Sequence, residues 1–200
     1  GLTANNSNYV FVQDAGNAMA LTINPAALTI TANNASKSYG QTASLTYSSS
    51  GLQNSETIGS VDLSSSGAAA TASVVGGPYL IVASNATGGT FDPANYSISY
   101  VNGVLHVSPA VLTVSANNVT KSYGQTQAFA GTEFVSSGLQ NGESIGNVVL
   151  SSSGAANTAN VAGSPYAIVA SNATGGTFNA GNYSISYVDG ALTVTPAALT

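Results

Sequence analysis

The chain has 200 residues, of which 4% are charged and 44% are hydrophobic, with no cysteine and a formal net charge of −5. Two basic side chains in the whole chain cannot neutralise the phosphates of a nucleic acid or hold an anionic bilayer surface, so both partners are excluded. High hydrophobicity with few charges also excludes a disordered polar tract, so we expect folded domains with a surface of Ser, Thr, Asn and Gly.

Short segments with strand patterns, separated by turn residues, predict an all-β chain with no long helix. In the first half of the chain, LQNSETI at 52–58 is the segment that could form one or two helical turns. The expected strands there are 28–32, 43–48, 60–64, 72–75 and 79–83.

A hairpin is expected after these strands. In YSISYVNGVLHV, Asn102 and Gly103 form a two-residue turn of the kind that tolerates positive φ at both positions, and Asp189 and Gly190 make the same turn later. Because side chains alternate between the two faces of a strand, each hairpin has one buried face. The expected buried residues are Tyr96, Ile98, Tyr100, Leu105 and Val107 in the first hairpin and Tyr183, Ile185, Tyr187, Leu192 and Val194 in the second.

Long segments of the sequence occur twice. LTITANNASKSYGQT begins at Leu28 and returns as LTVSANNVTKSYGQT at Leu112. GGPYLIVASNATGGTF begins at Gly76 and returns as GSPYAIVASNATGGTF at Gly163. A repeat of this length indicates an array of similar structural units.

The repeat divides the chain into two full units, 27–109 and 110–196. Residues 1–26 resemble the end of a preceding unit, and residues 197–200 resemble the start of a following one. Each unit ends at a proline that leads almost directly into the next strand, and proline restricts the backbone. We therefore expect a semi-rigid, elongated array.

The number of short strands in each unit predicts a small antiparallel β-sandwich of the immunoglobulin-like kind. If 52–58 is a real helix, a β-grasp arrangement of each unit is the alternative.

Nothing in the sequence indicates catalysis, a cofactor or a metal ion. His106 is the only histidine, and the second unit has Thr193 in its place. The acidic residues do not cluster, whereas calcium takes about six to eight oxygen ligands. We expect no catalytic, cofactor-binding or metal-binding residues, and no enzyme.

Lys37 and Lys121 are the only basic residues, and they occupy matching positions in the two units. Glu56 and Glu143 also match. Two readings stay open for these four residues. Either each lysine is a solvated side chain before a turn, alone or paired with the glutamate, or each lysine forms a covalent cross-link to an asparagine with the help of the glutamate.

Several motifs together resemble the MBG repeat of the YGX type. They are Lys37-Ser38-Tyr39-Gly40-Gln41, Gly138-Leu139-Gln140-Asn141-Gly142-Glu143, Tyr166-Ala167-Ile168, Asn182-Tyr183-Ser184-Ile185-Ser186-Tyr187 and Leu192-Thr193-Val194. That family occurs in arrays in very large bacterial surface adhesins, including filamentous-haemagglutinin-like proteins exported by two-partner secretion. The resemblance implies an extracellular or cell-surface stalk without catalytic residues.

The expected function is that of structural spacer units in a secreted or cell-surface bacterial adhesin, supporting cell adhesion or biofilm formation as an extended filament. The alternative is that the units themselves bind glycans or neighbouring filaments. Expected partners are neighbouring units of the same chain, and other filaments or glycans of the host or cell surface, without nucleic acid and without direct insertion into a membrane. Tyrosines gathered in an exposed groove of both units would favour direct binding, and inward tyrosines would favour the spacer.

Overall fold

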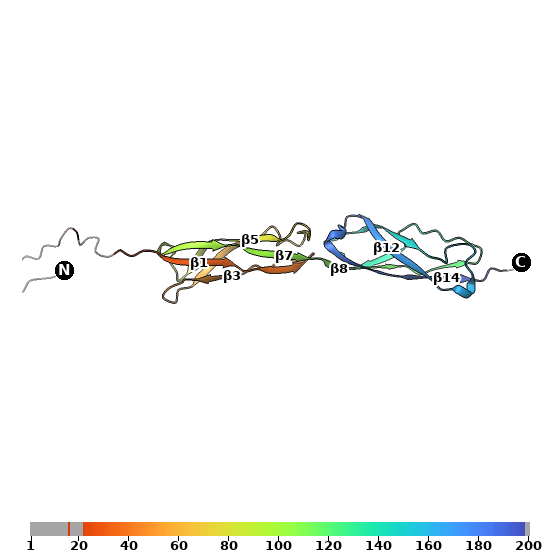
Figure 1. The fold of residues 1–200 in the computed structure, drawn as a ribbon, viewed down its shortest axis with the longest axis horizontal. Helices are drawn as coiled ribbons and strands as arrows, with labels where there is room; N and C mark the ends of the chain where they lie inside the picture. Colours follow the sequence, from red (N-terminus) through yellow and green to blue (C-terminus); the bar gives the residue numbers. More distant parts are fainter. Residues whose placement is uncertain (1–15, 17–21, 199–200) are drawn as a thin grey trace, which may run out of the picture.

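The computed structural model describes residue 16 and residues 22–198. Two β-sheet units lie end to end and give the molecule an elongated shape (Figure 1). Unit 1 contains β1 (Ala26–Ala32), β2 (Ala35–Ser38), β3 (Tyr47–Ser50), β4 (Ile58–Ser64), β5 (Tyr79–Gly89), η2 (Pro93–Asn95), β6 (Tyr96–Val101) and β7 (Gly103–Ser108). Unit 2 contains β8 (Ala110–Ala116), β9 (Val119–Ser122), β10 (Phe134–Ser137), β11 (Ile145–Ser151), η3 (Val161–Gly163), β12 (Tyr166–Gly176), η4 (Ala180–Asn182), β13 (Tyr183–Val188) and β14 (Gly190–Thr195).

Each unit is a small sandwich of two sheets with the same topology. In unit 1 the strand orders are β3-β1-β6 and β2-β7-β5-β4, and in unit 2 they are β10-β8-β13 and β11-β12-β14-β9. The all-β prediction is confirmed. The sheets are mixed rather than purely antiparallel, because β1 pairs in parallel with β6 and β2 pairs in parallel with β7, as do their counterparts in unit 2.

The two predicted hairpins are wrong. β6 pairs with β1, whereas β7, which begins at Gly103, pairs with β2 and β5, so the strands on either side of Asn102 belong to different sheets. Asp189 stands between β13 and β14, which begins at Gly190, in the same way. None of these four residues has a positive φ, so the dipeptides that resemble turns are crossings from one sheet to the other.

The glycine at each crossing allows a close approach of two backbones. A Cβ atom on Gly103 would lie 2.5 Å from the carbonyl oxygen of Ala32, so no larger residue fits. The next amide, Val104 N–H, donates to Asn34 Oδ1 at 2.8 Å. The Asn-Gly signal therefore records tight packing between the crossing segments rather than a reversal of the chain.

Residues 52–58 form a turn followed by the start of β4, not a helix. Asn54 and Ser55 both have positive φ, at 53° and 59°, which a helix does not allow. The β-grasp alternative is therefore wrong. The strand predicted at 72–75 is also wrong, because these residues lie in a loop.

Alternation along the strands places the apolar side chains between the two sheets of each unit. Leu28 and Ile30 on β1, Ile81 on β5 and Leu105 on β7 are fully buried in unit 1. Their counterparts in unit 2 are also fully buried: Leu112, Val114, Ile168 and Leu192. Each such side chain contributes about 1.5–3 kcal/mol.

Most of the residues predicted to face inward do so, because side-chain alternation depends only on the strand and not on its partner. Tyr96, Leu105 and Val107 are buried, and Ile98 is half-buried. Tyr100 is 37% exposed, and its hydroxyl accepts a hydrogen bond from Ala86 N–H at 2.9 Å.

Candidate functional site

The feature of the fold with the most specific chemistry is the junction between the units. The chain crosses it at Pro109, between β7 and β8. Two segments of unit 1 reach the next unit, namely the turn at Tyr39-Gly40 after β2 and the loop 70–75, and we call them the distal plug of unit 1. The side chains that receive them form the proximal socket of unit 2: Gln140, Asn141, Glu143, Asn182 and Tyr183.

Tyr39 is the centre of the contact. It is 4% exposed, and it is part of the apolar core cluster of unit 2 together with Tyr183. The two rings meet edge to face, with centroids 5.5 Å apart and planes at 78°, a favourable arrangement for aromatic pairs. The Tyr39 hydroxyl donates to Glu143 Oε1 at 2.6 Å, and the Tyr183 hydroxyl donates to the other carboxylate oxygen. One carboxylate thus joins a tyrosine from each unit.

Asn182 forms the second set of contacts across the junction. It is 4% exposed, and its Oδ1 accepts from Ser73 Oγ at 3.1 Å and from Val74 N–H at 3.0 Å. Asn141 Nδ2 donates to the Ala70 carbonyl at 3.4 Å. These bonds fix the direction of the plug as well as its depth, because hydrogen bonds require alignment that apolar contact does not.

Gly40 allows the plug to approach closely. A Cβ atom there would lie 2.3 Å from Gln140 Oε1, and the backbone has a φ of +87°, where side chains are rarely tolerated. The Tyr-Gly pair therefore supplies one large ring and one position without a side chain, side by side.

Burial governs the electrostatics of the junction. Burial, and then the hydrogen bond to Glu143, raises the pKa of Tyr183 to about 12. The same two causes, in the same order, raise the pKa of Tyr39. Both phenols are therefore neutral donors to the carboxylate at neutral pH.

The junction is expected to weaken in alkali. A pKa raised above its unfolded value of about 10 gives stability that is complete below pH 10 and is lost as the pH rises through the folded value. For Tyr183 the folded pKa is about 12, so its contribution to stability is lost as the pH rises from about 10 to about 12. Phenolate absorbance followed against pH should show late-titrating tyrosines in the wild-type chain and fewer of them in Tyr39→Ala. Loss of the amplitude of one tyrosine only, with the titration of the remaining tyrosines unchanged, would contradict the coupling.

The two lysines hold the distal plugs in shape. Lys37 is 8% exposed, and its ammonium donates to the carbonyls of Gln41, at 2.8 Å, and Ala69. Lys121 is 5% exposed and donates to the carbonyls of Gln125, at 2.8 Å, Ala155, at 3.3 Å, and Ala156. Burial lowers the pKa of Lys37. The reading as solvated lysines is therefore wrong.

Glu56 and Glu143 are not placed beside these ammonium groups. Glu56 accepts from the Tyr96 hydroxyl at 2.5 Å, at the opposite end of unit 1 from Lys37, since Tyr96 starts β6 and Lys37 pairs with Val107 near the end of β7. The hydrogen bonds described for both ammonium groups go to carbonyl oxygens. The covalent cross-link stays a prediction, tested by an intact mass that lacks one ammonia per unit.

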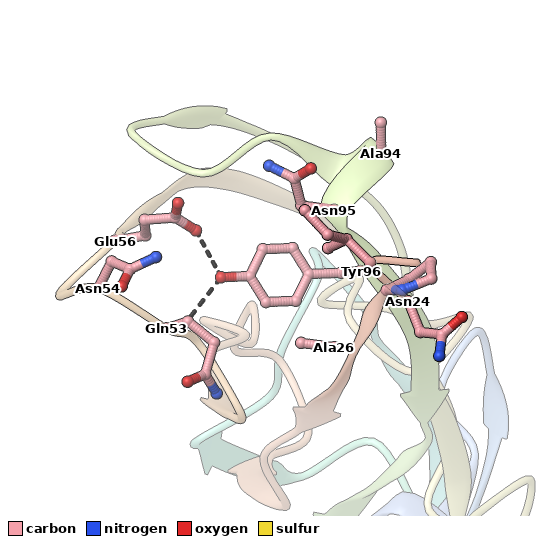
Figure 2. Close-up of a pocket in the computed structure, with 10 residues that line it drawn as sticks. Asn24, Ala26, Gln53, Asn54, Glu56, Ala94, Asn95 and Tyr96 are labelled. Atoms are coloured by element: carbon pink, nitrogen blue, oxygen red, sulfur yellow. Dashed lines mark hydrogen bonds between the residues drawn. The ribbon is translucent and has the colours of Figure 1, made fainter. Parts of the chain in front are cut away.

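Unit 1 has a proximal socket of its own, built from Gln53, Asn54, Glu56, Asn95 and Tyr96. These residues line a cleft of about 360 Å³ together with Ile23, Asn24, Pro25, Ala26 and Ala94. Figure 2 shows the Tyr96 hydroxyl between Glu56 and the backbone of Gln53, to which it is bonded. The cleft opens beside the segment that leads into β1.

His106 is exposed on β7, where it pairs with Ser36 of β2. Among the residues the structure describes, no three His, Cys, Asp or Glu side chains come together as a metal site would require. Within the same residues, no helix is long and apolar enough to cross a bilayer.

The family model of the MBG domain (YGX type) matches residues 28–106 and 112–193. The chain belongs to this family. Comparison with curated proteins gave no match. The two matched MBG segments coincide with the two sheet sandwiches, so the junction described above is a contact between consecutive MBG domains.

The sequence alone does not assign a site role to Tyr39 or Asn182. The signal was present, because Lys-Ser-Tyr-Gly-Gln and Asn-Tyr-Ser-Ile-Ser-Tyr occur in both MBG domains. A tyrosine before a glycine reads equally well as a turn at the edge of its own domain. Only the placement of the next domain shows that Tyr39 belongs to its neighbour's core.

Replacing Asn182 with alanine is expected to destabilise unit 2 by about 1–3 kcal/mol, because the half-buried Val74 amide loses its acceptor. Asn95→Ala is the matched control, since Asn95 occupies the same position in unit 1 and is exposed. Its effect should stay within about 0.5 kcal/mol. Denaturant unfolding of both full-length variants measures the difference, and equal losses would show that Asn182 acts within its own domain only.

Proposed function

We propose that these MBG domains are structural spacers in a large bacterial surface protein, where they hold an adhesive region away from the cell and so support adhesion or biofilm formation. The protein is extracellular in this proposal, and it performs no catalysis. Its mechanism is mechanical, because a spacer must transmit position from one end to the other. Family membership supports a repeat-type structural region of surface proteins.

The observation that carries the proposal is the junction. A flexible linker would leave the facing ends of the two domains polar and separate, whereas here Tyr39 of one domain is buried in the core cluster of the next. Hydrogen bonds to Glu143 and Asn182 add direction to that apolar contact. Such a joint resists bending in a way that a short linker alone does not.

The alternative, direct binding of glycans or of neighbouring filaments, has less support. Stacking on a sugar needs an open aromatic face, but Tyr96 and Tyr183 are buried and their hydroxyls are bonded to glutamates. Tyr100 and Tyr187 each accept a hydrogen bond from a backbone amide of their own domain, at 2.9 Å. The tyrosines at these positions therefore act in the fold of each domain.

A cell-based replacement separates the two functions. In the bacterium that carries the protein, both MBG domains are deleted in frame, or are exchanged for unrelated rigid domains of equal total length, and adhesion is measured. A spacer predicts loss of adhesion on deletion and recovery on exchange. Loss in both strains, with normal surface display, would overturn the spacer proposal and favour direct binding by the MBG domains.

A further inference from the structure

The sequence contains two Asn-Gly dipeptides, Asn102-Gly103 and Asn141-Gly142. In such a pair the backbone nitrogen of the glycine gives up its proton and attacks the side-chain amide carbon of the asparagine, because glycine has no side chain to shield that nitrogen. The bond between this carbon and the amide nitrogen breaks, ammonia leaves, and a five-membered succinimide remains. Water then opens the ring and gives aspartate, or isoaspartate, in which the backbone runs through the side chain. The reaction consumes only water.

The fold treats the two pairs differently. Gly103 is buried, and a Cβ atom there would lie 2.5 Å from the carbonyl oxygen of Ala32, so there is no room for a ring. Asn141 and Gly142 are both exposed, and a Cβ atom on Gly142 would meet nothing within 4 Å. Within the part of the chain that the structure describes, the Gly142 N–H has no hydrogen-bond partner. The attacking nitrogen is therefore accessible only at the second pair.

The backbone around Asn141 is also easier to open. Asn141 and Gly142 are the central residues of a turn, with φ values of 53° and 70°, as in a type I′ turn. The turn is closed by Glu143 N–H, which donates to the Gln140 carbonyl at 2.9 Å. Gly103 instead begins β7, which is paired on both sides, with β2 and with β5. An exposed turn opens locally at a much lower cost than a central strand does.

Unit 1 has the same turn without the reactive glycine. Asn54 and Ser55 occupy the matching positions, with φ values of 53° and 59°, and both are exposed. The Ser55 Cβ shields the nitrogen that would attack, so the reaction should be slower there. This turn also shows that a side chain is tolerated at the second position, so the backbone does not require Gly142.

Deamidation of Asn141 would change the junction directly. Asn141 Nδ2 donates to the Ala70 carbonyl at 3.4 Å, and a carboxylate cannot donate. Burial and the bond to Glu143 raise the pKa of Tyr39, and the Asn141 amide beside the phenol partly opposes them. An aspartate at this position would therefore place a negative charge close to Glu143, which binds a phenol from each unit. Like charges at such a site disfavour each other.

We propose that Asn141 deamidates spontaneously in the folded chain, and that the acidic product loosens the junction between the two MBG domains. Isoaspartate also adds an atom to the backbone of the turn, which displaces Gln140 and Glu143 from the plug. A stiff joint would thus become flexible as the protein ages. This inference goes beyond the spacer function, because it concerns how long the joint keeps its stiffness.

The first test measures the reaction. The full-length chain is kept folded in mildly alkaline buffer and then digested in acid, where the reaction stops, and peptide mass maps record the change from amide to acid. Asn141 should convert at least several-fold faster than Asn102 and Asn54, and Gly142→Ser should slow it several-fold. In denaturant, the two Asn-Gly pairs should convert at similar rates. Conversion of folded Asn141 no faster than that of Asn102 or Asn54 would overturn the proposal.

The second test measures the joint. Asn141→Asp reproduces the main charge change, and Asn54→Asp is the matched control, since Asn54 lies outside the observed junction. Residual dipolar couplings of the two domains should fit one alignment tensor in the wild type and in Asn54→Asp, and two in Asn141→Asp. One shared tensor in Asn141→Asp would overturn the effect on the joint. If that variant does not fold, aged and fresh wild-type chains are compared in the same way. The cell experiment on spacer function does not depend on either result.

Discussion

Replacing Tyr39 with alanine is expected to lower the free energy of unfolding of unit 2 by about 3 kcal/mol, although Tyr39 lies in unit 1. The ring is 4% exposed and packs in the core cluster of unit 2, so its removal leaves a cavity at the end of that core. Glu143 also loses one of its two phenol donors, and a hydrogen bond to a charged group contributes about 1.5–3 kcal/mol. Unit 1 should lose much less, because its own core cluster does not contain Tyr39.

The repeat supplies the control for this experiment. Tyr123 has the same neighbours in sequence and the same turn, but it is 48% exposed, so Tyr123→Ala should change stability by no more than about 0.5 kcal/mol. Tyr39→Phe separates the two contributions, since it keeps the ring and removes only the bond to Glu143. Denaturant unfolding, combined with hydrogen exchange of the Gln140 amide, measures all three variants. Equal losses in the two alanine variants would show that the tyrosine stabilises only its own turn.

Loss of the Tyr39 contact should also change the shape of the molecule. Residual dipolar couplings from the two domains should fit one alignment tensor in the wild type and two in Tyr39→Ala. Rigid alignment in the variant would mean that the Pro109 linkage alone fixes the angle between the domains.

The sequence predicted what depends on local pattern. Alternation identified inward residues such as Leu105 and Leu192 correctly, because the pleat fixes their direction whatever strand lies alongside. It failed at Asn102-Gly103, where the glycine is required by the nearby carbonyl of Ala32 rather than by a turn. A dipeptide cannot distinguish these two causes, since both need a residue without a side chain.

The junction was harder still to predict. The sequence indicated that the domains succeed each other closely at Pro109, but not which side chains meet. Tyr39 and Asn182 are far apart in the chain, and each is repeated in a domain where its environment differs. Identical residues with unequal burial, such as Tyr39 and Tyr123, reveal a contact between domains only once the exposure of both is known.

Lys37→Met is the second change with a large expected effect. Methionine keeps an apolar stem of similar length but removes the ammonium, so the Gln41 carbonyl loses its lysine donor and the Ala69 carbonyl keeps only the bond from Ala72 N–H. A hydrogen bond to a charged group contributes about 1.5–3 kcal/mol, so the loss of both bonds should lower the stability of unit 1 by about 2–4 kcal/mol in total. Ala69 adjoins the loop 70–75, so the plug should also become more mobile and its contact with unit 2 should weaken.

Lys121→Met distinguishes these two effects. Its ammonium holds the carbonyls of Gln125, Ala155 and Ala156 in unit 2, so the loss of stability within that domain should be similar. The plug that Lys121 shapes does not take part in the observed junction. Under native conditions, hydrogen exchange in residues 139–144 should therefore rise in Lys37→Met. In Lys121→Met it should stay at the wild-type level. Faster exchange in these residues in both variants, or in neither, would show that Lys37 has no specific effect on the junction. Because the lysine reaches its own loop and the loop reaches the next domain, a single buried ammonium contributes both to the fold of one domain and to its alignment with the next.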